Sequence, residues 1–248
     1  MILLVTLFVL FGWLVGIAIN HAADILPTRQ TVFQWPKCAQ CSAPRPLKQW
    51  SGLLNWLTGR RECPQCGVAH QRLVRSVVVE LVTPIFFAFL WWYYGFSTTL
   101  GIVTLYTIIL ILVTVTDLEH RLIFNVVILP SILLAIAAAF ITPDLTWRAA
   151  LVGGITGFII VYIAALLSRG GLGEGDVTLS TFLGFIMGFP NIILSLVFGV
   201  FMGGLVAFLL LVTGRVTLKT FIPYGPFLTI TGWIMLVWGD EIWRYYFS

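Results

Sequence analysis

Long runs of apolar residues follow one another along this chain, separated by short polar segments. A helix of about 20 apolar residues crosses the roughly 30 Å hydrocarbon core of a bilayer, and windows of that length cover most of the sequence. The pattern predicts eight transmembrane helices, at about residues 2–20, 76–93, 98–116, 123–141, 148–168, 176–189, 192–212 and 225–243. The sixth segment is short and ends at the turn signal Pro190-Asn191, so the alternative is a re-entrant segment that dips in and returns.

Composition supports the same fold class. The chain is 59% hydrophobic and 10% charged, with a mean hydropathy of +1.01, whereas charged residues make up about a quarter of an ordinary soluble domain. We therefore expect an all-α polytopic membrane protein with about eight transmembrane helices, surrounded by the lipid bilayer. The net charge of +4 then reflects membrane topology, and we expect no nucleic-acid partner.

The basic residues predict which side of the membrane each loop faces, because Lys and Arg accumulate in cytoplasmic loops. When residues 21–75 lie inside, every basic residue except Arg148 and Arg244 falls in an inner loop. A non-spanning sixth segment places one more basic residue outside, so the distribution favours eight spans with both termini outside. The first apolar run lacks a basic n-region and a small-residue cleavage site, which predicts a retained helix.

All four cysteines lie in residues 21–75, the one polar segment of any size, which we treat as a cytoplasmic loop domain. Cys38 and Cys41 form one C-x-x-C pair, and Cys63 and Cys66 form a second. Two such turns present four thiolates in the tetrahedral arrangement of structural zinc sites. Disulfides are the alternative, but they do not persist in a reducing cytosol. The pattern therefore predicts a zinc-ribbon-like loop with a structural zinc ion.

A short amphipathic helix is predicted between the two cysteine pairs. Trp50, Leu53, Leu54 and Leu57 recur at the spacing of one helix face. Two interpretations remain open at this point: the apolar face lies on the lipid headgroups, or it covers the small core of the ribbon.

Two aspartates stand at the ends of apolar runs. Asp117 closes the third predicted span and Asp176 opens the sixth, so the predicted topology places both at the cytoplasmic boundary. Ionisable groups in such positions are costly and mark functional sites. Two carboxyls that share one proton can activate water against a peptide carbonyl, which makes a catalytic pair the leading hypothesis. If the third helix ends at Asp117, helix dipoles favour a protonated Asp117 and an ionised Asp176.

Glycines surround the second aspartate and predict an irregular approach to it. They permit positive φ and let an extended substrate backbone come close to the carboxyl; they are Gly170, Gly171, Gly173 and Gly175. Structural alternatives remain for each carboxyl, because Asp176 can be a helix N-cap and Asp117 can pair with Arg121. Elsewhere, small residues four positions apart predict close helix packing, at 153 with 157 and at 199 with 203.

The order of these motifs resembles the type IV prepilin peptidase family, membrane aspartyl proteases with a Gly-x-Gly-Asp motif. The resemblance covers nearly the whole chain. It rests on the two C-x-x-C pairs after the first helix, then Val79-Glu80-Leu81-Val82-Thr83, Asp117-Leu118 with Ile123 and Asn125, Gly173-Glu174-Gly175-Asp176 and Ile222-Pro223-Tyr224-Gly225-Pro226-Phe227.

The resemblance implies cleavage of the basic leader of type IV prepilins or pseudopilins after a glycine. Asp117 and Asp176 would be catalytic, at the cytoplasmic face of the bacterial inner membrane. In bifunctional members the new N-terminus is then methylated with S-adenosylmethionine, and the cysteine loop belongs to that activity. Glu80 is the candidate for a residue of the methyltransferase site. Members usually carry Gly two positions before the third cysteine, where this chain has Arg61. They usually carry Arg-Tyr-Pro before Val-Glu, where this chain has Arg75-Ser76-Val77. A peptidase without methyltransferase activity is therefore an alternative.

The expected organisation is a first transmembrane helix at 1–20, the four-cysteine loop domain at 21–75 and a transmembrane peptidase domain at 76–248. Two functions from other classes compete with this hypothesis. One is a proton- or cation-coupled transporter that uses Asp117 and Asp176. The other is a membrane scaffold that docks through its zinc ribbon, which gives the two aspartates no purpose.

Overall fold

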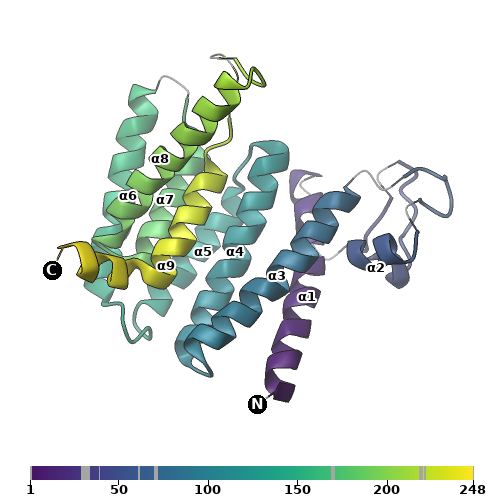
Figure 1. Ribbon diagram of the computed structural model, residues 1–248, viewed down its shortest axis with the longest axis horizontal. Coiled ribbons are helices and arrows are strands. Elements are labelled where there is room, and N and C mark those ends of the chain that lie inside the picture. Colours follow the sequence, from purple (N-terminus) through teal and green to yellow (C-terminus); the bar gives the residue numbers. More distant parts are fainter. Residues whose placement is uncertain are drawn as a thin grey trace. The chain divides into compact units, whose positions relative to one another are not determined.

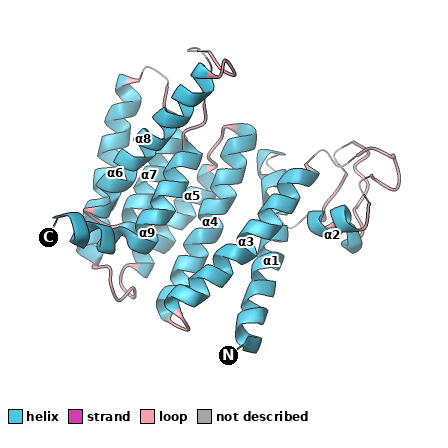
Figure 2. Cartoon of the chain, viewed as in Figure 1, coloured by secondary structure: helices cyan, strands magenta, loops and turns pink. Residues whose placement is uncertain are grey.

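Every element in the described part of a computed structural model of this chain is helical (Figures 1 and 2). The structure describes residues 2–28, 34–38, 40–60, 62–69, 72–168, 171–217, 220 and 222–247. The α-helices are α1 (Ile2–Ile25), α2 (Gly52–Leu57), α3 (Leu73–Tyr94), α4 (Thr98–His120), α5 (Asn125–Ala138), α6 (Trp147–Leu167), α7 (Glu174–Met187), α8 (Asn191–Val212) and α9 (Gly225–Phe247), with short 3-10 turns η1 (Leu26–Thr28) and η2 (Leu47–Gln49).

The chain divides into two compact units, Met1–Thr104 and Leu105–Ser248. In the first, α1 packs along α3. Small residues allow this close approach, because a Cβ at Gly12 would stand 2.9 Å from the ring of Phe87. One turn along, a Cβ at Gly16 would stand 3.1 Å from the Cα of Glu80. The α1–α3 pair therefore forms the scaffold on which the cysteine loop is built.

Helix α7 is the central helix of the second unit, where it contacts α5, α6, α8 and α9. Its tightest neighbour is α6, because Gly153 and Gly184 bring the two backbones together and Gly157 faces the carbonyl of Ser180. Lipid tails are as apolar as the side chains of membrane helices, so these helices gain little from the hydrophobic effect when they associate. Small residues let their backbones approach closely, and the close packing stabilises the contact. The predicted packing role of the 153 and 157 pair is confirmed. Gly199 and Gly203 likewise face residues of α9.

Gly184→Ala should destabilise this unit. A Cβ at position 184 would overlap the carbonyl of Gly153, which is backbone and cannot move aside. We expect a loss of about 1–3 kcal/mol, as for other overpacked interiors. Thermal unfolding in detergent, followed by tryptophan fluorescence, measures it. Gly204→Ala in α8 is the control, since no neighbouring atom lies within 4 Å of that Cβ position. Equal melting of the two variants would contradict the packing argument.

Within the described residues, five helices are long and apolar enough to cross a membrane, as expected of a multi-pass membrane protein: α1 with η1, α3, α4, α6 and α8. They coincide with five of the eight predicted spans. Helices α5 and α7 have 14 residues each, about 21 Å of helix and less than the hydrocarbon thickness. The predicted count of eight spans is therefore not confirmed.

The helix predicted between the cysteine pairs is present but shorter, and it buries an unexpected face. Its buried residues are Gly52 and Asn55, whereas Leu54, Trp56 and Leu57 are exposed. The reason is that α2 packs against the membrane helix α3, where Gly52 allows close approach to Ser76. Leu54 and Leu57 of the predicted apolar face are thus left exposed.

Candidate functional site

Asp117 lies in the last turns of α4 and is only 5% exposed. Because α4 continues to His120, the carboxyl is not beyond a helix C-terminus, and the predicted assignment of the proton by helix ends does not hold. The Oδ2 atom of Asp117 is buried and has no hydrogen-bond partner among the described residues. It is thus an unused acceptor or proton site inside the second unit.

The first residue of α9 lies directly against Asp117. A Cβ on Gly225 would stand 2.5 Å from Oδ2 and 3.0 Å from Cγ, and the Gly225 N–H approaches the carboxyl. This approach falls short of a full hydrogen bond to Oδ2, which remains unpartnered. The N–H groups at a helix N-terminus carry partial positive charge. The start of α9 therefore places the positive end of a helix against Asp117, and any larger residue at position 225 would displace the carboxyl.

Asp176 occupies the first turn of α7 and is 8% exposed. Its Oδ2 accepts a hydrogen bond of 3.0 Å from the backbone N–H of Gly173. Gly173 is the N-cap of α7 and Asp176 is the third residue of the helix. The alternative that Asp176 is itself the N-cap was therefore wrong. The hydrogen bond holds the carboxyl at the helix start and leaves its other oxygen for chemistry.

The described glycines before Asp176 do not have the positive φ that their number suggested, whereas the approach of a substrate backbone to them stays a prediction. Gly171, Gly173 and Gly175 lack positive φ, because α7 already begins at Glu174; Gly170 lies outside the described residues. Gly175 instead admits the chain that follows α4, since a Cβ there would stand 2.7 Å from the Cβ of Ile123. The glycine motif thus brings the segment after Asp117 against the start of α7.

The structure brings the two predicted carboxyls into one electrostatic neighbourhood. The charge of Asp176 acts on Asp117 and on Tyr224, in the segment before α9. Burial, with a smaller contribution from Asp176, raises the pKa of Tyr224 to about 12, so its hydroxyl keeps its proton at neutral pH. Sequence reasoning did not assign roles to Tyr224 and Gly225, although they stand in a motif that carried the resemblance. Two buried carboxyls, a helix N-terminus and a phenol together suit acid–base chemistry on a polar bond.

The four predicted cysteines meet in the first unit. They are free thiols, and their sulfurs all lie within 4.8 Å of one another. The Cys38 and Cys66 sulfurs are 3.7 Å apart, and those of Cys41 and Cys63 are 3.8 Å apart. Four sulfurs bound to one zinc ion at about 2.3 Å stand about 3.8 Å from each other. The cluster can therefore hold a metal ion of that kind.

Two equivalent turns build this cluster. The Cys38 N–H donates to the Ala43 carbonyl at 2.9 Å, and the Cys63 N–H donates to the Val68 carbonyl at the same distance. The backbone N–H groups of Cys41 and Gln40 point at the first sulfur and hold the pKa of the Cys38 thiol at about 6. The N–H groups of Gln65 and Cys66 likewise lower the pKa of the Cys63 thiol. At these two cysteines the backbone thus favours the thiolate, the form that binds metal.

Glu80 lies elsewhere in the first unit, fully buried on α3. Its oxygens accept hydrogen bonds from the backbone N–H groups of Gly52 and Leu53 and from the side chains of Ser51, Asn20 and Trp13. These donors come from α1 and from the start of α2. Glu80, the residue predicted to take part in methylation, is therefore a buried acceptor whose hydrogen bonds connect the cysteine loop to the α1–α3 pair.

Two family models match the chain. The model of the type IV leader peptidase family matches residues 104–208, which contain both aspartates. The model of the bacterial Peptidase A24 N-terminal domain matches residues 10–94, which contain the four cysteines and Glu80. Together they cover most of the sequence.

Curated proteins named prepilin leader peptidase/N-methyltransferase are similar to the chain. The one from Bacillus subtilis is 27% identical over 241 residues, which cover 96% of this chain and 95% of the relative. The one from Pseudomonas aeruginosa is 28% identical over 216 residues, covering 84% and 73%. The one from Neisseria gonorrhoeae is 27% identical over 215 residues, covering 84% and 72%. No solved structure matches the chain.

Proposed function

The chain belongs to the type IV leader peptidase family, and on that premise we propose that Asp117 and Asp176 are its catalytic pair. The substrates are type IV prepilins or pseudopilins, whose basic leader is cut after a glycine at the cytoplasmic face. The observation that carries the proposal is the pair of buried carboxyls at the ends of α4 and α7. Both lie within the family match, and relatives of the chain are named for this reaction.

The reaction needs one shared proton. One carboxylate removes a proton from water as the water oxygen attacks the scissile carbonyl carbon, and the protonated carboxyl donates to the carbonyl oxygen. The proton then reaches the leaving amine as the C–N bond breaks. The titration belongs to the pair and not to either residue. Gly173 and Gly225 orient the two carboxyls, and burial excludes bulk water from the pair.

Leader release from a defined substrate tests the proposal. Detergent-solubilised protein is incubated with a prepilin, and the products are identified by mass spectrometry. We expect a single cut after the glycine, and no cut in a substrate in which a bulky residue replaces that glycine. An intact prepilin, together with proton or cation movement by the protein in liposomes, would instead support a transporter that uses the same carboxyls.

We further propose that the chain methylates the new N-terminus. The support is the match to the N-terminal domain of the family and the names of the relatives. S-adenosylmethionine would supply an electrophilic methyl group: the N-terminal amine would bond to the methyl carbon and lose a proton, while the S–CH3 bond breaks and S-adenosylhomocysteine leaves. Transfer of labelled methyl to a cleaved prepilin measures this activity, and its absence would make the chain a peptidase only. Arg61, the departure from the family before the third cysteine, lies outside the described residues.

Zinc is the metal that the four thiolates fit best, and we propose a structural role for it. Four protein ligands leave no open position for a substrate.

We also propose the bacterial inner membrane as the location, with residues 21–75 and the carboxyl pair on the cytoplasmic side, as the basic residues favour. The loop domain at 21–75 would serve methylation and residues 76–248 would serve cleavage.

Removing one zinc ligand should release the metal. We expect about one zinc ion per wild-type chain and a large loss of bound zinc in Cys38→Ser and Cys63→Ser, because three sulfurs hold the ion far less tightly. Elemental analysis of purified protein measures the content. Ser42→Ala is the control, since Ser42 lies beside the cluster and supplies no sulfur. Wild-type zinc content in both cysteine variants would refute the site.

A further inference from the structure

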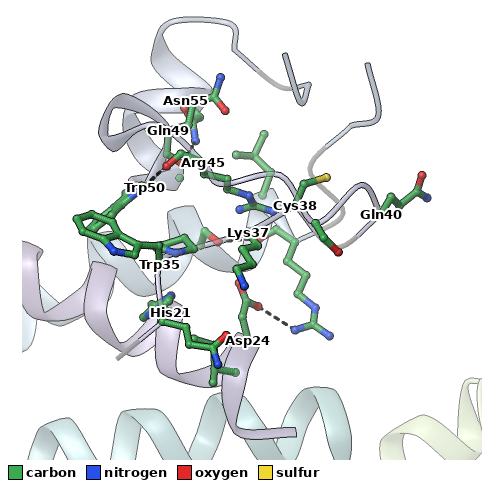
Figure 3. A pocket seen from close by; sticks show the side chains of 18 of the residues that line it. His21, Asp24, Trp35, Lys37, Cys38, Gln40, Arg45, Gln49, Trp50 and Asn55 are labelled. Atoms are coloured by element: carbon green, nitrogen blue, oxygen red, sulfur yellow. Dashed lines mark hydrogen bonds and ion pairs between the residues drawn. The ribbon is translucent and has the colours of Figure 1, made fainter. Parts of the chain in front are cut away.

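The first unit contains a cavity of about 500 Å³ beside the cysteine cluster, and the proposed functions do not yet use it. Its lining includes His21 and Asp24 of α1, Trp35 and Arg45 of the first cysteine turn, and Asn55 of α2 (Figure 3). Cavities of about 300–1,000 Å³ hold small organic ligands. The size therefore suits one molecule with a mass of several hundred daltons.

Three buried atoms of the lining residues have no hydrogen-bond partner in the described part of the chain: Gln49 Oε1, Asn55 Oδ1 and Arg45 Nε. Gln49 and Asn55 are 8% and 3% exposed. The side-chain nitrogen of Asn55 donates a hydrogen bond of 2.9 Å to the backbone carbonyl of Gln49. This bond orients the Asn55 amide and leaves its oxygen unused. Unsatisfied buried polar groups are costly. A fitting ligand therefore offers N–H donors to the two amide oxygens and an acceptor to the guanidinium.

Two indoles of the lining offer their faces to a cationic group in the same ligand. The indoles of Trp35 and Trp50 lie 5.3 Å apart, and the Trp50 Nε1 is fixed by the Arg45 carbonyl. Indole faces attract cations. In Figure 3 the amides of Gln49 and Asn55 lie at one end and His21 and Asp24 at the other, with the indoles between them. Asp24 pairs with Arg72 and Arg75, so this end offers charges of both signs, which can meet the carboxylate and the ammonium of a zwitterion.

We propose that this cavity is the S-adenosylmethionine site. The inference rests on the proposed methyltransferase function and adds to it the residues that hold the methyl donor. The adenine amino group of such a molecule provides N–H donors for Gln49 and Asn55, and an adenine ring nitrogen provides the acceptor for Arg45. Its amino-acid group then lies at the Asp24 end, and its sulfonium is the cation that the indoles between the two ends attract.

Glu80 has a defined part in this site, although it does not line the cavity. It binds the N–H groups of Gly52 and Leu53 and so fixes the start of α2, three residues before Asn55. It is a positioning residue for the amide end of the cavity. Through these contacts a fully buried carboxyl would influence methylation without touching the methyl donor or the substrate.

Equilibrium binding of labelled S-adenosylmethionine to the full-length, zinc-loaded protein in detergent tests the site. Gln49→Met keeps the length of the side chain and removes its polar atoms, and Trp35→Leu changes an exposed side chain. We expect the dissociation constant to rise about tenfold in each, the effect of one lost buried hydrogen bond or cation–π contact. Gln65→Met is the control, because Gln65 is exposed on the second cysteine turn and outside the cavity.

Zinc content and leader cleavage should be unchanged in these variants, which shows that they fold. Wild-type binding by both Gln49→Met and Trp35→Leu would overturn the cavity assignment while leaving the methyltransferase function standing. A wild-type protein that neither binds the labelled donor nor methylates a cleaved prepilin would refute the function itself. Displacement of the label by ATP as readily as by S-adenosylhomocysteine would make the cavity a nucleotide site and overturn the proposal.

Glu80→Gln should weaken binding of the methyl donor without changing the cavity lining. The amide keeps one oxygen acceptor and replaces the other with a donor, which faces the N–H groups of α2. We expect a several-fold rise in the dissociation constant, with zinc content and cleavage as for the wild type. Unchanged binding in Glu80→Gln would remove Glu80 from the site but not the cavity.

Discussion

Asp117→Asn and Asp176→Asn should each abolish leader cleavage, lowering kcat/KM by about 10³-fold or more, within the range of lost acid–base catalysis. Asparagine has nearly the volume of aspartate but can neither share the proton nor remove one from water. The change in position 176 keeps an oxygen for the Gly173 N–H, so the start of α7 stays in place. Cleavage of a fluorescent prepilin peptide measures the effect, and the unfolding temperature shows that the fold is kept.

Glu174→Gln is the matched control for this pair. Glu174 stands in the same turn of α7 as Asp176, carries the same charge and is exposed. Its neutralisation should leave cleavage within about twofold of wild type, as for other exposed charges. Normal cleavage by either aspartate variant would show that the second carboxyl works alone and that the paired mechanism is wrong.

Gly225→Ala should reduce cleavage by about 100-fold, with little change in stability. The added methyl would stand 2.5 Å from Oδ2 of Asp117, so the carboxyl must rotate or α9 must retreat. Displacement of a catalytic group by about 1 Å commonly costs such a factor. Because the methyl meets the end of a side chain, the adjustment is local, and we expect kcat to fall more than KM rises.

Gly204→Ala again provides the comparison, since it adds the same methyl to a helix of the same unit in open space. Its activity should equal that of the wild type. Wild-type activity in Gly225→Ala would mean that the start of α9 has no part in holding Asp117. A large fall in the unfolding temperature of Gly225→Ala alone would mean that the glycine serves packing instead.

Sequence reasoning succeeded where the chemistry is local. The cysteine cluster follows from two short turns, each of which fixes its own two sulfurs. The carboxyls were identifiable because a charge at the end of an apolar run is rare. Those features depend on neighbours within a few positions along the chain.

The features that sequence reasoning missed depend on contacts between distant segments. Nothing in the residues around 225 indicates that the start of α9 meets α4 at Asp117. Likewise, the spacing of Trp50 to Leu57 predicted a helix but not its buried face, because the packing partner is α3. The functional division at residue 75 followed polarity and stays a prediction, while the compact unit of the structure extends to Thr104 because α3 packs on α1. The number of spans stays a prediction, since short helices such as α5 carry no clear signal of crossing.

The hydrogen bonds of Glu80 have a consequence for biogenesis. As α3 enters the bilayer, this carboxyl brings a polar group toward the hydrocarbon, at a cost below the roughly 3 kcal/mol that an acidic residue has at the centre of a membrane helix. Three of its five donors, at Ser51, Gly52 and Leu53, belong to the loop that precedes α3. Stable insertion of α3 therefore waits for that loop to fold. A nascent chain whose loop cannot fold would leave its second membrane segment poorly anchored and open to quality-control proteolysis.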